Sequence, residues 1–354
     1  MTRALVAAAL LVAVAGCRRD GPRELPSRPA RPTSAPATAT SAPATAASAP
    51  ATAAAAPAPA SRTAAVALPT QPGCPLSGQP WRFPAVPRLI ALGDLHGDLS
   101  AARAALGLAG AVDDRDRWIG GALWVVQTGD ILDRGDDEQA IVDWFERLER
   151  EADAAGGRFV WMLGNHEIMN AAGDLRYVTA AGLRDFDDVP GLALERVARA
   201  PAQVRARLAA FLPGGPYAKI LAGQHYVTIV GDTVFVHGGI APGQAAGLDV
   251  ELLAARCWLD GEGAPPDALE DDEGPLWNRA FAREDVDCAA LDRALRELGV
   301  ARMVVGHTVQ EHGVTSACDG KVWRIDVGMS AAYGGPRQVI ELTASGVRVL
   351  GAAP

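Results

Sequence analysis

Short apolar runs alternate with helical patterns from residue 85 to the end of the chain. Runs with the length of buried strands cover residues 85–92, 121–128, 158–163 and 301–307, and residues 225–239 are typical of a hairpin with Gly231 and Asp232 at its tip. Between these runs, segments such as residues 137–155 carry apolar side chains at the spacing of an amphipathic helix. Because strands alternate with helices, the pattern predicts an α/β sandwich.

The first 74 residues follow neither pattern. Residues 4–15 are an unbroken apolar run after Arg3, and the run is too short to span a bilayer as a helix. The run VAGC at residues 14–17 resembles a bacterial lipoprotein signal, which implies that residues 1–17 are a lipoprotein-type signal peptide with Cys17 lipidated. An ordinary signal peptide with a coincidental cysteine is the alternative. Residues 18–74 are rich in Ala, Pro, Ser and Thr and cannot bury enough apolar area to offset chain entropy, so a disordered tether is expected.

The remaining residues, 75–354, have the length of one domain. Within them, residues 171–223 are longer than a simple connection and contain a helical pattern, so this segment is expected to form a cap insert beside the site. The net charge of −9 provides no electrostatic basis for binding nucleic acid, and no nucleic-acid partner is expected.

Polar side chains follow each predicted strand at the point where it ends. Four of the six histidines occupy these turns with two aspartates and an asparagine, the full set being Asp94, His96, Asp130, Asn165, His166, His237 and His307. One such turn is weak evidence for a ligand site. Five turns at one sheet edge would bring their polar side chains together, and this arrangement costs free energy unless a cation compensates the charge. Oxygen and imidazole ligands without thiolate suit two divalent ions of Mn, Fe or Zn, with Asp130 as the natural bridge.

The same turns carry the motifs GDLHGD (93–98), GDILDRG (129–135), GNHE (164–167), HGG (237–239) and VGH (305–307). This ordered set resembles the signature of the calcineurin-like metallophosphoesterases, and its DRG and GNHE forms are most similar to the phosphoprotein phosphatase branch. The runs NHEIMNAAGDLRYVT, GPLWNRAF and IDVGMSAAYGG further resemble the Shewanella-like protein phosphatases. The resemblance covers about residues 86–345 and implies a metallophosphoesterase β-sandwich flanked by helices, with a helical cap insert.

The resemblance also implies a dinuclear metal site. The first ion would be held by Asp94, His96 and Asp130, and the second by Asp130, Asn165, His237 and His307. A water or hydroxide between the ions would attack phosphorus in line.

Other residues of these motifs have implied roles in proton transfer and phosphate binding. His166 would protonate the leaving alkoxide, and Asp133 would orient its imidazole. Arg134 offers a planar guanidinium that fits phosphate oxygens, with Asn165 beside it, and Arg279 is expected to be a second phosphate clamp.

Three further polar residues have weaker signals. Arg176 either approaches substrate or only braces the insert. His225 and His312 match no ligand turn, so we expect them to be packing or rim residues.

Four cysteines in the expected mature chain form an even set. Cys74, Cys257, Cys288 and Cys318 allow two disulfides with three possible connectivities. One hypothesis links Cys257 to Cys288 across an acidic loop and leaves Cys74 to pair with Cys318.

The leading hypothesis is a metal-dependent phosphomonoesterase that acts on phosphoprotein, with a phosphotyrosine preference. A hydrolase of dinucleoside polyphosphates or other small phosphoesters is an alternative, because the same metal turns serve both reactions. A non-catalytic module that binds phosphorylated ligands is a third interpretation, and the intact ligand set argues against it. We expect the protein to be exported and lipid-anchored to the bacterial cell envelope, and Arg18, which stands where an inner-membrane retention aspartate would, favours the outer membrane facing the periplasm.

Overall fold

The computed structural model describes residues 66–67, 74, 76 and 79–352. The predicted signal peptide, Cys17 and most of the predicted tether lie outside the described residues. In the part of the chain that is described, no helix is both long enough and apolar enough to cross a membrane.

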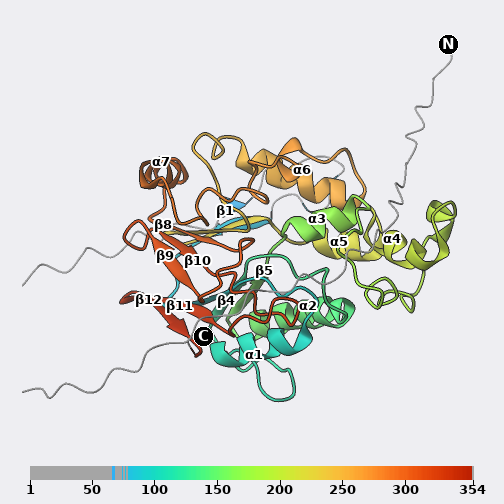
Figure 1. Ribbon diagram of the computed structural model, residues 1–354, viewed down its shortest axis with the longest axis horizontal. Coiled ribbons are helices and arrows are strands. Elements are labelled where there is room, and N and C mark those ends of the chain that lie inside the picture. The colour runs from blue at the N-terminus through green and yellow to red at the C-terminus, as the bar shows by residue number, and fades with distance from the viewer. Residues whose placement is uncertain (1–65, 68–73, 75, 77–78, 353–354) are drawn as a thin grey trace, which may run out of the picture. The chain divides into compact units, whose positions relative to one another are not determined.

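Two mixed β-sheets form the centre of the fold (Figure 1). Among the described residues, one sheet has seven strands in the order β1-β2-β6-β7-β8-β10-β9, and the other has five in the order β12-β11-β3-β4-β5. The strands of the first sheet are β1 (Val66–Ala67), β2 (Pro80–Phe83), β6 (Val227–Val230), β7 (Thr233–Val236), β8 (Arg302–Val305), β9 (Thr315–Ala317) and β10 (Val322–Arg324). Those of the second are β3 (Arg88–Leu92), β4 (Trp124–Gln127), β5 (Arg158–Trp161), β11 (Val339–Thr343) and β12 (Gly346–Leu350).

The two sheets pack face to face over an apolar layer. Strand β3 sends Leu89 and Ala91 into this layer, where they meet side chains of the other sheet such as Phe235 and Val304. The alternate residues of β3 are buried in the core on the outer, helical side. Because successive side chains point to opposite faces, a strand buried on both sides reads as a continuous apolar run, which is the pattern of residues 85–92.

Helices cover the outer faces of the sandwich. Figure 1 shows α1 (Leu99–Ala109) and α2 (Glu138–Ala154) on one side of the strands and α6 (Leu248–Asp260) on the other. The apolar stripe predicted for residues 137–155 is the buried face of α2. The other helices are α3 (Asn165–Ala171), η1 (Leu194–Val197), η2 (Ala202–Val204), α4 (Arg205–Phe211), α5 (Pro216–Ala222), η3 (Asp267–Leu269) and α7 (Cys288–Leu298).

The segment 171–223 contains η1, η2, α4 and α5. Its helical content agrees with the sequence pattern, and its role as a cap stays a prediction. The α/β sandwich flanked by helices is confirmed, as is the hairpin, in which β6 pairs antiparallel with β7 around Gly231 and Asp232.

Strand direction determines where the polar turns meet. Strands β3, β4 and β5 run parallel in one sheet, and β7, β8 and β10 run parallel in the other. The turns that follow these strands gather at one edge of the sandwich, where ligands of α/β sheets ordinarily bind.

The disulfide hypothesis is wrong in both pairs. The structure links Cys74 to Cys257 and Cys288 to Cys318, each with a Cα–Cα distance of 5.5 Å. Helix α6 carries Cys257 to the N-terminal segment, where the adjacent Arg256 donates to the Leu76 carbonyl at 2.8 Å. Cys288 instead begins α7, which lies against the turn after β9. Cys257 and Cys288 are close in the sequence on either side of the acidic loop, but this closeness does not predict the disulfide pairing.

Candidate metal centre

Asp130 lies at the centre of the site. It follows β4, and its Oδ2 is 3.8 Å from Nε2 of His96, 3.8 Å from Nε2 of His166 and 3.2 Å from Nε2 of His237. These three histidines come from the turns after β3, β5 and β7, and all four side chains are buried. The fold thus brings four motifs that are distant in the sequence into one cluster.

The turns of the site hold unusual backbone conformations. Five residues that are not glycine have a positive φ there, namely His96, Asp130, Asp133, Arg134 and His307. Each such conformation costs about 1–3 kcal/mol and persists only where the surroundings enforce it. Gly306 is required for a different reason, because a Cβ atom there would lie 2.5 Å from Oδ1 of Asp94.

Backbone carbonyls orient two of the histidine rings. Nδ1 of His96 donates to the Leu132 carbonyl at 3.1 Å, and Nδ1 of His237 donates to the Thr128 carbonyl at 2.9 Å. Each bond leaves the lone pair on Nε2 pointing toward Asp130. This is the arrangement in which an outer hydrogen bond fixes the tautomer of a metal-ligating histidine.

The described residues contain two groups whose ligand atoms lie close enough to share an ion. One is His96, Asp130 and His166, and the other is Asp130, His237 and His307. Asn165 joins the second group, since its Oδ1 is 3.0 Å from Nε2 of His237.

His307 provides the observation that a metal fits here. Its Nε2 is buried and has no hydrogen-bond partner among the described residues. A buried imidazole nitrogen without a partner is costly, and a cation beside Asp130 would satisfy it. With carboxylate, imidazole and amide donors, the residues present fit two divalent ions such as Mn, Fe or Zn.

Two further carboxylates border the cluster. The predicted ligand Asp94 lies beside the first group, with its Oδ2 4.0 Å from Nε2 of His96, and it accepts the His307 N–H. Asp326 is also buried, and it follows β10, a sixth parallel strand that ends at the site. Sequence reasoning did not assign Asp326, although the residue lies inside the quoted run IDVGMSAAYGG.

The carboxylates and histidines shift each other's pKa values. Burial raises the pKa of Asp94 well above its usual value, and Asp326 and Asp130 raise it further. Burial would also raise the pKa of Asp130, but the imidazoles of His237 and His166 lower it well below its usual value. Burial and the adjacent His237 lower the pKa of His307 to about 2, so that ring is neutral, as a metal ligand must be.

His166 and Asp133 form a close pair at the edge of the cluster. Nδ1 of His166 lies 2.5 Å from Oδ2 of Asp133, and both side chains are buried. Burial would lower the pKa of His166, but Asp130 and Asp133 raise it above the usual value. Arg134 lies on the other side of the ring, with its Nη2 donating to Nε2 of His166 at 3.2 Å.

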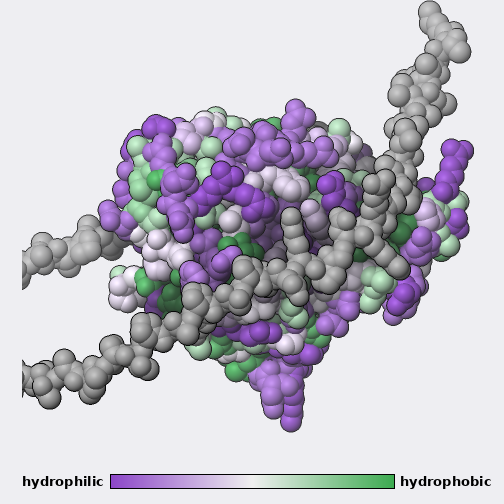
Figure 2. All heavy atoms as spheres, viewed as in Figure 1, coloured by the Kyte–Doolittle hydropathy of each residue, from purple (hydrophilic) through white to green (hydrophobic). Residues whose placement is uncertain are grey.

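Two tyrosines missed by sequence reasoning flank Arg134. The guanidinium carbon is 4.5 Å from the ring centre of Tyr177 and 5.4 Å from that of Tyr333. Tyr177 also lies 5.1 Å from the ring of His166, and Tyr333 lies 5.4 Å from the ring of His96. Tyr177 and Tyr333 are both exposed, at 40% and 42%. Figure 2 shows hydrophilic side chains over much of one face of the molecule, with apolar side chains scattered among them. Arg134 therefore has two aromatic rings close to its guanidinium.

The two weaker arginine candidates differ in position. Nη1 of Arg279 donates to the His307 carbonyl at 3.0 Å and to Oγ1 of Thr308 at 2.9 Å, so Arg279 borders the metal cluster. Arg176 is exposed and pairs with its neighbour Asp174. Contact of either side chain with phosphate stays a prediction.

Glu167 holds the central turn from beneath, and sequence reasoning missed it. Its carboxylate accepts the backbone N–H groups of Asp130, Ile131, Leu132 and Gly164 at 2.7–3.0 Å. Burial and the nearby Asp130 raise the pKa of Glu167 to about 7. Its place as the fourth residue of GNHE was the available signal.

A cavity of about 780 Å³ opens beside the cluster and is lined by His96, Arg134, Thr179, Arg184 and Arg337 among others. Through this cavity a substrate could reach Arg134, the residue predicted to bind phosphate.

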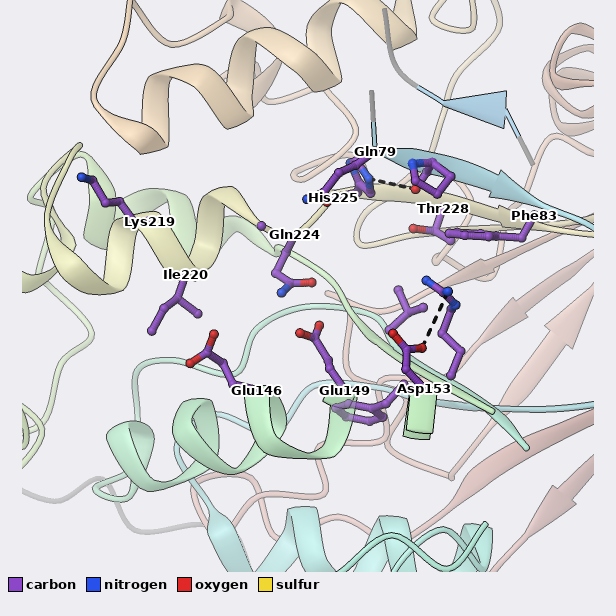
Figure 3. A pocket seen from close by; sticks show the side chains of 15 residues that line it. Gln79, Phe83, Glu146, Glu149, Asp153, Lys219, Ile220, Gln224, His225 and Thr228 are labelled. Atoms are coloured by element: carbon purple, nitrogen blue, oxygen red, sulfur yellow. Dashed lines mark hydrogen bonds and ion pairs between the residues drawn. The ribbon is translucent and has the colours of Figure 1, made fainter. Parts of the chain in front are cut away.

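A second cavity, of about 430 Å³, lies between α2 and α5 (Figure 3). Its wall contains Glu146, Glu149 and His225, and none of the predicted site residues. Burial lowers the pKa of His225 to about 3, and its Nε2 donates to the Pro80 carbonyl at 3.2 Å. This agrees with the expectation that His225 is a packing residue.

The motifs, the sandwich and the His–Asp cluster agree with the relatives of the chain. Residues 87–311 match the calcineurin-like phosphoesterase family. The chain belongs to this family. It is 40% identical over 329 residues to Shewanella-like protein phosphatase 2 of Arabidopsis thaliana, which covers 82% of this chain and 84% of that protein. It is 29% identical over 265 residues to Shewanella-like protein phosphatase 1 of Plasmodium berghei, covering 70% and 69% respectively.

A solved structure has the same fold. The cold-active protein tyrosine phosphatase of a psychrophilic Shewanella species superposes with a TM-score of 0.63 at 25% identity, covering 78% of this chain and 82% of that one. The resemblance stated from the sequence motifs is confirmed by these relatives.

Proposed function

We propose that this calcineurin-like phosphoesterase is a protein phosphatase that hydrolyses phosphotyrosine. The observation that carries the proposal is the position of Arg134, which contacts His166 at the edge of the metal cluster and lies close to the rings of Tyr177 and Tyr333. The names of the relatives, which include protein phosphatases and a protein tyrosine phosphatase, support the same substrate class.

The metal-binding residues would be Asp94, His96, Asp130, Asn165, His237 and His307. His166 also belongs to the first group of candidate ligand atoms, and we assign it to proton transfer. When bound, a pair of divalent cations would activate water for attack on phosphorus and neutralise phosphate charge. Manganese is the ion we would supply first, because the mixed oxygen and nitrogen donors suit it.

The chain's own side chains would bind phosphate and move the proton. Arg134 presents a planar guanidinium, and its Nε is buried without a partner among the described residues, so a phosphate oxygen would satisfy it. Asp133 holds the His166 ring through Nδ1. Nε2 accepts from Arg134 in this structure, so when Arg134 turns to the phosphate and the ring is protonated, Nε2 would give a proton to the leaving oxygen. Asn165 and Arg279 are the further candidates for phosphate contact.

Tyr177 and Tyr333, the two tyrosines beside Arg134, support the proposal that the substrate is aromatic. A phosphotyrosine ring could pack against the exposed ring of Tyr177 or Tyr333 while its phosphate meets Arg134, and such a ring contact adds about 0.5–1.5 kcal/mol. A phosphoserine side chain has no ring to make these contacts. The geometry therefore favours phosphotyrosine over phosphoserine without a change in the metal site.

The test is hydrolysis of a panel by the purified protein with Mn²⁺. The panel contains a phosphotyrosine peptide, a phosphoserine peptide and diadenosine tetraphosphate. We expect fastest cleavage of the phosphotyrosine peptide, and His166→Asn should reduce it by about 10²–10⁴-fold. Preference for the dinucleotide would assign nucleotide hydrolysis, and binding of phosphopeptides without turnover would assign a binding module; either result overturns the proposal.

We also propose that the enzyme is exported and attached to the outer membrane through a lipid on Cys17. The sequence before Cys17 supports this, and two disulfides suit an oxidising compartment. Incorporation of labelled palmitate in expressing cells, lost in Cys17→Ser, tests it. A wild-type protein that takes up no label and fractionates with soluble proteins would contradict it.

A further inference from the structure

A buried arginine of segment 171–223 contacts the carboxylate that orients His166. Arg207 lies on α4, and its side chain is fully buried. A buried guanidinium is tolerated only when its charge and its N–H groups are satisfied. Arg207 therefore needs partners, and it finds them beneath the metal cluster.

Every N–H of this guanidinium has an acceptor. Nε donates to Oδ1 of Asn170 at 2.8 Å, and Nη1 donates to the Gly182 carbonyl at 2.8 Å and to Oε2 of Glu138. Nη2 donates to Oε1 of Glu138 at 2.8 Å and to Oδ1 of Asp133 at 3.3 Å. Five donors in a rigid fork fix the positions of their acceptors, which a lysine could not do.

The two oxygens of Asp133 have separate tasks. Oδ2 meets Nδ1 of His166, while Oδ1 accepts from Arg207 and from Nδ2 of Asn170 at 2.9 Å. The backbone N–H of Asp133 is held in turn by Glu138. Because Asp133 cannot rotate without losing these bonds, Arg207 and its partners determine the orientation of the His166 ring.

Arg207 is also fixed to the segment from which it comes. Its guanidinium carbon lies 5.3 Å from the ring centre of Phe186 and 5.4 Å from that of Phe211. The two rings contact each other edge to face at 4.8 Å, and Phe186 packs on Tyr217 at 4.7 Å. The position of the guanidinium thus depends on the packing of residues 171–223.

We propose that Arg207 is a positioning residue that acts through Asp133 on His166 and couples proton delivery to the folding of segment 171–223. This inference rests on the proposed phosphatase function. It predicts that loss of Arg207 harms the reaction most where the leaving oxygen needs a proton. A merely structural arginine would change all substrates alike.

The experiment compares two substrates whose leaving groups differ in basicity. Phosphotyrosine peptide releases a basic phenolate, whereas p-nitrophenyl phosphate releases an anion that needs little protonation. In Arg207→Met we expect kcat on the peptide to fall about 10–100-fold, the loss typical of an outer positioning partner, and the loss on p-nitrophenyl phosphate to be about tenfold smaller. KM should change by less than about threefold on both.

Two further variants separate positioning from folding. In a His166→Asn background, Arg207→Met should cause no additional loss on the peptide, because the group it positions is already gone. Arg256→Met is the matched control, since Arg256 is an equally buried arginine that bonds the Ala222 and Leu76 carbonyls and does not contact Asp133. It should lower stability and leave the ratio of the two rates unchanged.

Equal losses on both substrates, or additive losses in the His166→Asn background, would overturn the inference while leaving the phosphatase function intact. If Arg207→Met does not fold, the ratio of the rates on the two substrates is measured in Arg207→Lys and in the charge-balanced Glu138→Gln/Arg207→Met. A ratio unchanged from the wild type in both variants would equally overturn the inference. A wild-type enzyme inactive on both substrates would overturn the proposed function, and this inference with it.

Discussion

The pKa values of the buried Glu167 and the half-buried Glu149 shift in the same direction, but the two carboxyl groups have different surroundings. Burial raises the pKa of each to about 7. Glu167 accepts four backbone N–H groups of the central turns, whereas Glu149 lines the cavity of Figure 3 and faces Gln224. Glu167 therefore supports the turns of the metal site, whereas Glu149 has side-chain partners such as Gln224 and none in the site.

Replacing Glu167 should therefore be costly. In Glu167→Gln one acceptor oxygen becomes an NH₂ group that faces N–H donors, so at least one buried donor loses its partner. We expect a loss of about 1–3 kcal/mol in the free energy of unfolding, measured by urea denaturation. The exposed Glu195→Gln is the control and should change stability little. Unchanged stability in Glu167→Gln would show that the four bonds do not hold the turn.

The position of Tyr177 beside Arg134 predicts an effect on substrate preference. Tyr177→Ala removes one ring from Arg134, and a cation–π contact contributes about 0.5–2 kcal/mol. We expect kcat/KM on a phosphotyrosine peptide to fall about tenfold more than on a phosphoserine peptide. Tyr177→Phe keeps the ring and should preserve the preference. An equal fall on both peptides would mean that Tyr177 supports Arg134 without contacting the substrate ring.

At the scale of elements, helix α2 has a half-buried acid, Glu149, on the face that borders the second cavity. The folded protein binds the proton of Glu149 more tightly than the unfolded chain does, because burial raises its pKa from 4.5 to about 7. The free energy of unfolding therefore falls as pH rises from about 4.5 through about 7 and stays lower above that range.

Glu149→Gln should remove this loss. Its gain in stability over the wild type should be small near pH 4.5 and reach about 1–3 kcal/mol at pH 8. Thermal unfolding at the two pH values measures it. Glu146→Gln, on the same face and less buried, should show a smaller effect of the same sign. A gain that does not depend on pH would contradict the assignment to Glu149.

The strands and their turns were predictable because each buried strand is an apolar run that ends in glycine and a polar residue. Asp326 was missed because β10 has only three residues, too few to show such a run. Arg207 was missed because its partners lie at positions 133, 138, 170 and 182, and only the packing of α4 brings them together. Motif position could have identified Glu167, whereas no local pattern identifies Arg207.

At the scale of the whole molecule, two disulfides join distant parts of the described chain. Cys74–Cys257 spans 183 residues and ties the N-terminal segment to α6, whereas Cys288–Cys318 spans 30 residues and ties α7 to the turn after β9. The sequence could not choose among the three connectivities, because the choice depends on the direction in which α6 and α7 leave the sheet.

The two links should contribute unequally to stability. Closing a longer loop removes more entropy from the unfolded chain, and the dependence on loop length makes the Cys74–Cys257 contribution about 1–2 kcal/mol larger. We therefore expect Cys74→Ser/Cys257→Ser to lower the free energy of unfolding more than Cys288→Ser/Cys318→Ser, each measured by urea denaturation without reductant. A non-reducing peptide map of the wild type is the control for connectivity. A larger loss from the shorter link would show that native packing around α7, and not loop entropy, determines what each disulfide contributes.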